Sequence, residues 1–251
     1  MNRLCYYCNA PSKTLEHVPP KCLFPKGTKK NYRINLMKVP SCDLHNSNKS
    51  GDDQYMMVYF AARAKGLDYE KLRPHIDKTV KTILRKPHFL SEYTDQIKIV
   101  PKVDGQPYLT NVDWHNPQNH IELKSNYERI GNFLAAVARG VLFYDKGIQW
   151  EGAVLVLPHF LGTLETDDGA SITTINEIMI DPNFSTGDNQ EIFFYRTKSH
   201  DNNRIKHIVD MCFYNEMKAT CLFMPREMRA QVEDKFVTAN FVRWVDYEPS
   251  L

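Results

Sequence analysis

Hydrophobic and polar residues alternate with different periods along the chain, and these changes predict where elements begin and end. The clearest helical pattern spans residues 125–147, where apolar residues recur every three or four positions: Ile130, Phe133, Leu134, Val137 and Val141. Ser125 and Glu128 have the spacing of a capping box, and Gly147 is a residue type that commonly ends helices. We therefore predict a long helix with one buried face.

The rest of the chain after residue 50 predicts further helices and several strands. Residues 52–66 are acidic at their start, apolar in the middle and closed by Gly66, which favours a helix. A second helix is predicted over residues 68–86. Hairpins are predicted over residues 97–112 and 205–225, and strands over residues 152–158, 172–180 and 191–197. This mixture predicts an α+β body with antiparallel sheet and helices, over residues 61–251.

The first 50 residues show a different pattern. They contain many prolines and little helical periodicity, and a segment this short cannot bury much of a core by itself. We therefore predict a small N-terminal domain over residues 1–60 that depends on a bound metal. The body, residues 61–251, carries no motif that names a chemistry, so its expected role is target selection, dimerisation or regulation.

Composition narrows the class of protein. The chain has 251 residues, of which 42% are hydrophobic and 25% charged, as in ordinary globular proteins. It has no apolar run of the roughly 18 residues that a membrane span needs. The first residues contain no apolar signal region. The expectation is a cytoplasmic protein with no membrane partner.

Charge is unevenly distributed. The net charge is only +2, but the first 50 residues contain nine Lys or Arg residues and only two acidic ones, Glu16 and Asp43. A basic segment attached to a mildly acidic body favours a polyanion such as nucleic acid as the partner. Lys21, Arg33 and Lys49 are the candidate phosphate contacts. A solvated, lysine-rich loop would give the same charge pattern.

The cysteines are also concentrated near the N-terminus. Cys5-x-x-Cys8 and Cys42-x-x-His45 have the same two-residue gap, which lets both side chains of each pair approach one tetrahedral ion. Two such pairs form a far more specific pattern than one. We therefore predict a structural zinc bound by Cys5, Cys8, Cys42 and His45. Cys22 is an alternative fourth ligand, which would release His45 for another role.

The residues between the two pairs resemble the HNH endonucleases, a family built on a ββα-metal hairpin. The resemblance covers residues 1 to about 60 and rests on elements that occur in the family's order: Glu16-His17-Val18, Pro19-Pro20, Asn35-Leu36 and Cys42-x-x-His45-Asn46. The trailing Asn46-Ser47-Asn48-Lys49-Ser50 is similar to a segment of the HNH domains in CRISPR effector nucleases.

The resemblance implies a reaction and a role for each residue. It implies hydrolysis of phosphodiester bonds, in DNA more than in RNA, with His17 as the general base. Glu16 and Asn46 would bind one Mg²⁺ or Mn²⁺ ion, and Asn35 would orient His17 by a hydrogen bond. The structural zinc would fix the start of the helix that carries Asn46. A homodimer is compatible with this family.

The sequence also departs from the family's pattern. Glu16 stands where Asp or His is commoner, Asn46 replaces the final His, and His45 replaces a cysteine. A second hypothesis therefore remains, a non-catalytic zinc-stabilised module that binds nucleic acid or protein. Such a module needs only the four zinc ligands and the basic loop, whereas an endonuclease also needs Glu16, His17, Asn35 and Asn46.

Overall fold

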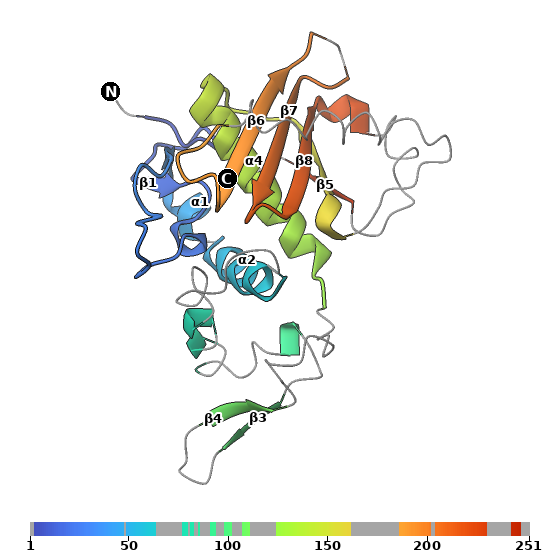
Figure 1. Ribbon diagram of the computed structural model, residues 1–251. Coiled ribbons are helices and arrows are strands. Elements are labelled where there is room, and N and C mark those ends of the chain that lie inside the picture. The colour runs from blue at the N-terminus through green and yellow to red at the C-terminus, as the bar shows by residue number, and fades with distance from the viewer. Residues whose placement is uncertain are drawn as a thin grey trace.

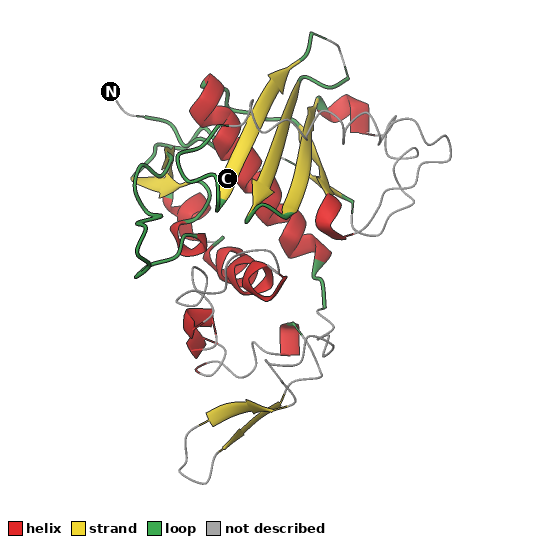
Figure 2. Cartoon of the chain, in the orientation of Figure 1, coloured by secondary structure: helices red, strands yellow, loops and turns green. Residues whose placement is uncertain are grey.

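The computed structural model of the protein describes most of the chain. The described residues are 3–47, 49–63, 77–79, 81–82, 85, 91–93, 98–101, 107–110, 124–161, 186–201, 204–229 and 242–246. Their elements are mixed helix and antiparallel sheet, as an α+β fold requires (Figures 1 and 2). None of the helices in these ranges has the length and apolar character that crossing a membrane requires.

A short hairpin and two helices form the N-terminal part of the fold. Strand β1 (Thr14–His17) pairs antiparallel with β2 (Lys38–Ser41). The 3-10 helix η1 (Lys21–Leu23) lies in the connection between these strands. Helix α1 (Asp43–Ser47) begins just after β2, and α2 (Ser50–Arg63) follows it. The helix predicted over residues 52–66 is confirmed as far as Arg63, and residues 64–66 lie outside the described residues. The order strand, strand, helix is the one expected for the first 60 residues.

Five antiparallel strands form the main sheet, in the order β6-β7-β8-β5-β9. Their bounds are β5 (Ala153–Pro158), β6 (Phe193–Ser199), β7 (His207–Phe213), β8 (Met217–Met224) and β9 (Arg243–Val245). The predicted strand at 152–158, the strand at 191–197 and the hairpin at 205–225 are confirmed. The strand predicted at residues 172–180 lies outside the described residues.

Smaller elements complete the described chain. A separate hairpin joins β3 (Lys98–Pro101) to β4 (Pro107–Thr110), as predicted for residues 97–112. Two further 3-10 helices are η3 (His159–Leu161) and η5 (Arg226–Met228). Of the helix predicted at 68–86, residues 77–79, 81–82 and 85 are helical, and the others lie outside the described residues.

Helix α4 (Tyr127–Lys146) is the predicted long helix, but its N-terminal cap differs from the prediction. The Asn126 side chain accepts a hydrogen bond from the backbone N–H of Arg129, so Asn126 is the N-cap. Ser125 lies one residue earlier, and its hydroxyl is 2.7 Å from the Tyr59 hydroxyl. The capping box predicted from Ser125 was therefore wrong by one position. Gly147 ends the helix with φ 68°, as predicted.

Helix α4 packs between the sheet and the N-terminal part (Figure 1). Its apolar residues are buried against the sheet. On the other side, Gly140 lies so close to Val18 that a Cβ atom at position 140 would meet Val18 Cγ2 at 2.6 Å. Only glycine permits this approach of the helix to the residue that follows β1.

Buried residues of the N-terminal part share one hydrophobic cluster with α4 and much of the main sheet, and this cluster extends from Cys5 to Phe223. Leu155, Leu157, Leu222 and Met224 of the sheet form a second cluster. Polar contacts also join the two parts. The Tyr214 hydroxyl donates to the Leu23 carbonyl at 2.6 Å, and Asn189 Nδ2 donates to the Ile34 carbonyl at 3.0 Å. The predicted boundary near residue 60 is therefore crossed by continuous packing in this structure.

Candidate metal centre

Cys5, Cys8, Cys42 and His45 come together at one point of the N-terminal part. Cys5 and Cys8 lie in the loop before β1, Cys42 directly follows β2, and His45 is in α1. Their ligand atoms all lie within 4.8 Å of one another, close enough to bind one metal ion. The three cysteines are buried and His45 is half-buried. The four predicted ligands therefore form one cluster.

The distances within the cluster fit a tetrahedral ion. With Zn–S near 2.3 Å and Zn–N near 2.0 Å, tetrahedral geometry separates two sulfurs by about 3.8 Å and a sulfur from a nitrogen by about 3.5 Å. Cys8 Sγ and Cys42 Sγ are 3.8 Å apart. His45 Nδ1 is 3.2 Å from Cys42 Sγ and 3.8 Å from Cys5 Sγ. This donor set is compatible with a structural metal such as zinc.

Neighbouring groups hold the ligands in place. The backbone N–H of Tyr7 lies 3.4 Å from Cys5 Sγ and donates to it. The Tyr7 ring stacks on the His45 imidazole, with ring centroids 4.3 Å apart. The guanidinium of buried Arg139 also lies over the Tyr7 ring, 5.0 Å from its centroid. Because Arg139 belongs to α4, the cluster is fixed partly by the body.

Cys22 lies outside this cluster. Its Sγ contacts the backbone oxygen of Asp53 at 3.6 Å, on the far side of η1. Burial raises the pKa of its thiol to about 12. The alternative in which Cys22 replaces His45 as the fourth ligand does not agree with this geometry.

Glu16 points from β1 into the interior. It is only 5% exposed, although the residues on either side of it are more exposed. Its Oε1 forms an ion pair with Lys49 Nζ and lies 3.5 Å from the Tyr6 hydroxyl. Its other oxygen, Oε2, is buried without a hydrogen-bond partner among the described residues. One carboxylate oxygen of the predicted metal ligand is thus paired, and the other is unsatisfied.

Asp53 is a further acidic residue at this place that sequence reasoning missed. It lies one helical turn after Lys49, and its Oδ1 is buried without a hydrogen-bond partner in the described part of the chain. Burial raises the pKa of Asp53 to about 6, although Lys49 opposes the shift. Burial lowers the pKa of Lys49. The signal in the sequence was the spacing of Lys49 and Asp53, which puts them on one helical face.

His17 lies on the opposite side of β1 from Glu16, as expected for neighbours in a strand. It is half-buried and faces Lys38 across the hairpin. Burial lowers the pKa of His17, and the charges of Lys38, Lys21 and Arg33 lower it further. The imidazole is therefore held neutral near a group of cations, which is the state that a general base requires.

Asn46 and Asn35 occupy different surroundings. Asn46 is in α1, and its Nδ2 donates to Thr14 Oγ1 at 3.0 Å. Asn35 is exposed and adopts φ 52°, three residues before β2 rather than on the strand. Both residues are described, and no hydrogen bond joins Asn35 to His17. The catalytic roles assigned to both asparagines stay predictions.

The side chains of the three candidate phosphate contacts differ in exposure and in the groups they already contact. Lys21 is exposed on η1. Arg33 is half-buried, and its Nε donates to the Phe24 carbonyl at 2.9 Å, which fixes the guanidinium near His17. Lys49 has a side chain only 15% exposed and is paired with Glu16. Lys21 and Arg33 can meet a polyanion as the structure stands, whereas Lys49 cannot without leaving Glu16.

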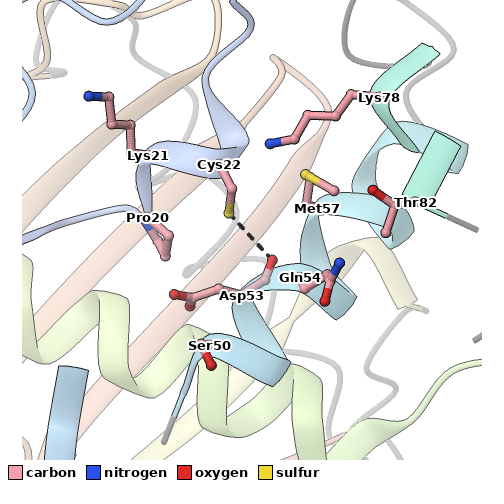
Figure 3. A pocket seen from close by; sticks show the side chains of 9 residues that line it. All are labelled: Pro20, Lys21, Cys22, Ser50, Asp53, Gln54, Met57, Lys78 and Thr82. Atoms are coloured by element: carbon pink, nitrogen blue, oxygen red, sulfur yellow. Dashed lines mark hydrogen bonds between the residues drawn. The ribbon is translucent and has the colours of Figure 1, made fainter. Parts of the chain in front are cut away.

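A pocket of about 340 Å³ opens beside these residues, between η1 and α2 (Figure 3). Lys21 and Cys22 line one side, Asp53 and Met57 the other, and Lys78 lies at the edge. Its volume is at the lower end of the roughly 300–1,000 Å³ of small-ligand sites.

Comparison with known proteins gives no family for this chain, since no family model, no curated protein and no solved structure matches it. The function must therefore be argued from the site itself.

Proposed function

We propose that the chain is a metal-dependent endonuclease of the HNH type, which hydrolyses phosphodiester bonds with His17 as its general base. The support is the combination of a strand–strand–helix unit, a Cys/His cluster at the start of its helix and an adjacent Glu-His pair on β1. Each element has other uses, and it is their combination in one small unit that supports the proposal.

The observation that carries the proposal is the surroundings of His17. Its imidazole is neutral and lies among Lys21, Arg33 and Lys38. A neutral histidine can accept the proton of an attacking water, and the neighbouring cations can bind the phosphate that is attacked. A histidine of purely structural use gains nothing from three nearby cations, because they disfavour its protonated form.

The residues assigned to the divalent ion fit it in part. Glu16 offers a buried, unsatisfied carboxylate oxygen, and Asn46 offers an amide oxygen, which are ligand types that Mg²⁺ and Mn²⁺ prefer. A bound ion would stabilise negative charge on the phosphoryl and leaving oxygens. The protein's own contribution is to place Glu16 and His17 on opposite faces of one strand, so that one binds and the other accepts a proton.

The Cys/His cluster has a separate, structural role in this proposal. Its four donors leave no coordination position for substrate, as in zinc sites that stabilise a fold. It connects the loop before β1 to the start of α1, and thereby fixes Asn46 relative to β1. The proposed substrate is nucleic acid, DNA more than RNA; a homodimer and a cytoplasmic location stay predictions.

A plasmid-nicking assay tests the proposal. With Mg²⁺ or Mn²⁺ the protein should cut, and with EDTA it should not. His17→Ala should lower the rate by about 10²–10⁴-fold, the usual contribution of a general base, while zinc content and fold are unchanged. The matched control is His200→Ala, since His200 is an exposed histidine outside the site. Cleavage by His17→Ala at the rate of the wild type would overturn the assignment.

The binding module without catalysis is the second candidate, and the Glu16–Lys49 ion pair favours it. That pair occupies one oxygen of the proposed metal ligand. In this case the protein would bind nucleic acid through Lys21 and Arg33, and its affinity would fall steeply as the salt concentration rises. It would not cut nucleic acid with any divalent ion. The nicking assay with the wild type separates the two functions.

A further inference from the structure

A largely buried lysine, Lys49, links two acidic residues of different elements, Glu16 of β1 and Asp53 of α2. Lys49 Nζ pairs with Glu16 Oε1. The backbone N–H of Asp53 donates to the Lys49 carbonyl at 2.9 Å, so these two residues lie one turn apart on the same helical face. The charges of Lys49 and Asp53 act on each other. The ammonium group of Lys49 is thus ion-paired with Glu16, and its charge also acts on Asp53.

These three residues have more acceptors than the protein satisfies. Glu16 is only 5% exposed, and both its Oε2 and Asp53 Oδ1 are buried without a hydrogen-bond partner among the described residues. Buried carboxylate oxygens are normally paired, and two that are not, next to one cation, are unusual. A divalent cation accepts several oxygen ligands at once and would satisfy both, which a single ammonium group does not.

Asp53 also lies at a pocket that opens to solvent. Asp53 lines the pocket of about 340 Å³, together with Ser50 and Lys21. In Figure 3 the Asp53 carboxylate lies on the side of Pro20, away from Lys78 and Thr82. A hydrated ion can therefore approach Asp53 through the pocket without unfolding the hairpin.

We propose that Asp53 is an additional oxygen ligand of the divalent ion and that Lys49 is an internal cation which gives up its place when the ion binds. The inference rests on the divalent-ion site of the proposed function and adds a residue and a competitor to it. Without the ion, Lys49 compensates the charge of Glu16 and Asp53. With the ion, the two carboxylates bind it, and the ammonium group of Lys49 leaves them.

The competition makes opposite predictions for the two residues. Removal of the competing charge in Lys49→Met should tighten Mn²⁺ binding, and removal of a ligand in Asp53→Asn should weaken it, by about 10–100-fold in each case. The measurement is titration of zinc-loaded protein with Mn²⁺, followed by the loss of the free-ion electron paramagnetic resonance signal. Zinc content before and after titration shows that the Cys/His cluster is unaffected.

Asp52→Asn is the matched control, because it removes the same charge at the neighbouring position. The Asp52 carboxylate pairs with Arg129, whose Nε lies 2.7 Å from Asp52 Oδ1. The Asp52→Asn variant should therefore leave Mn²⁺ affinity unchanged. Zinc-loaded Lys49→Met without added Mn²⁺ should also melt at a lower temperature than the wild type and recover when Mn²⁺ is added, since two buried carboxylates lack a cation until the ion binds.

Equal Mn²⁺ affinity in Asp53→Asn and Asp52→Asn would overturn the inference, and this comparison decides even if Lys49→Met does not fold. The result is independent of cleavage. If the wild type binds Mn²⁺ through Asp53 but does not cut, the proposed function fails and this site stands. If His17→Ala abolishes cutting but Asp53→Asn binds Mn²⁺ normally, the proposed function stands and the assignment of Asp53 as a ligand fails.

Discussion

At the scale of single residues, the sequence predicts which face of an element a side chain lies on better than it predicts which side chain it contacts there. Alternation along β1 correctly separates Glu16 from His17, because a strand sends neighbouring side chains to opposite faces. The four Cys/His ligands were also predictable, since their spacing defines a tetrahedral set. The ion pair of Glu16 with Lys49 was not, because it joins residues 33 positions apart that only the tertiary fold brings together.

His159 illustrates a residue whose role appears only in the structure. Its Nε2 lies 3.0 Å from Thr220 Oγ1, and the Thr220 hydroxyl in turn donates to Asp210 at 2.9 Å. Thr220 therefore accepts from His159, which requires an N–H at Nε2. Burial lowers the pKa of His159 to about 4, with Lys218 acting in the same direction.

This pKa predicts how stability depends on pH. The folded protein resists protonation of His159, whereas the unfolded chain takes up a proton near pH 6.5. The stabilisation is therefore complete above pH 6.5 and is lost as the pH falls toward about 4, by at most about 3 kcal/mol. Urea unfolding between pH 4.5 and 7 should show a steeper loss in the wild type than in His159→Gln. Identical slopes in the two proteins would contradict the assignment.

At the scale of elements, periodicity predicts helices and strands well, whereas their caps and contacts depend on neighbours. The extent of α4 follows from its apolar repeat and Gly147. The N-cap moved to Asn126 because the Ser125 hydroxyl hydrogen-bonds with that of Tyr59, a residue of α2. Similarly, nothing in the local sequence shows that Gly140 must be small; the reason is Val18 on the facing segment.

The contact of Gly140 with Val18 gives a test of how tightly α4 and the hairpin pack. In an exposed helix, Gly→Ala stabilises by up to about 1 kcal/mol. Here the added Cβ would meet Val18 Cγ2 at 2.6 Å, so Gly140→Ala should instead destabilise, by about 1–3 kcal/mol. Thermal or urea unfolding measures the change.

The matched control is Gly51→Ala in α2, where the nearest atom to the new Cβ is Arg129 Nη2 at 3.5 Å, an ordinary contact. This variant should be neutral or slightly stabilising. Combining Gly140→Ala with Val18→Ala should recover part of the loss, because the second change removes the methyl groups that clash. Additive losses in the double variant would show that the two side chains do not meet.

At the scale of the whole molecule, the sequence predicted two units and the structure joins them by one core. The change of pattern near residue 50 is real in composition, since the first 50 residues are basic and rich in proline. Burial, however, is not visible in composition. Tyr6, Phe24 and Tyr32 belong to the same hydrophobic cluster as α4 and the main sheet. We therefore expect a metal bound by the Cys/His cluster to stabilise the packing of the body as well as the N-terminal part.

Removal of the metal tests this coupling. The cluster fixes the loop that carries Tyr7, and the Tyr7 ring lies against the guanidinium of Arg139. Arg139 in turn donates hydrogen bonds to the backbone oxygens of Trp150 and Gly152, just before β5. Loss of the metal should therefore loosen both the hairpin and the packing of α4 on the sheet. All three tryptophans lie beyond residue 100, so their fluorescence reports on the body alone.

Cys42→Ser, or extraction of the metal by a strong chelator, should lower the urea midpoint measured by tryptophan fluorescence, and restoring zinc to the wild type should reverse the change. Lys13→Ala is the control, because Lys13 lies beside the cluster but only forms an exposed ion pair with Asp43 at 2.5 Å. If Cys42→Ser leaves the tryptophan transition in place while the N-terminal part unfolds, the hairpin and the body are independent units. The physical reason for expecting the opposite is that Val18 lies directly against Gly140 and that both parts contribute to one hydrophobic cluster, which their separation would expose.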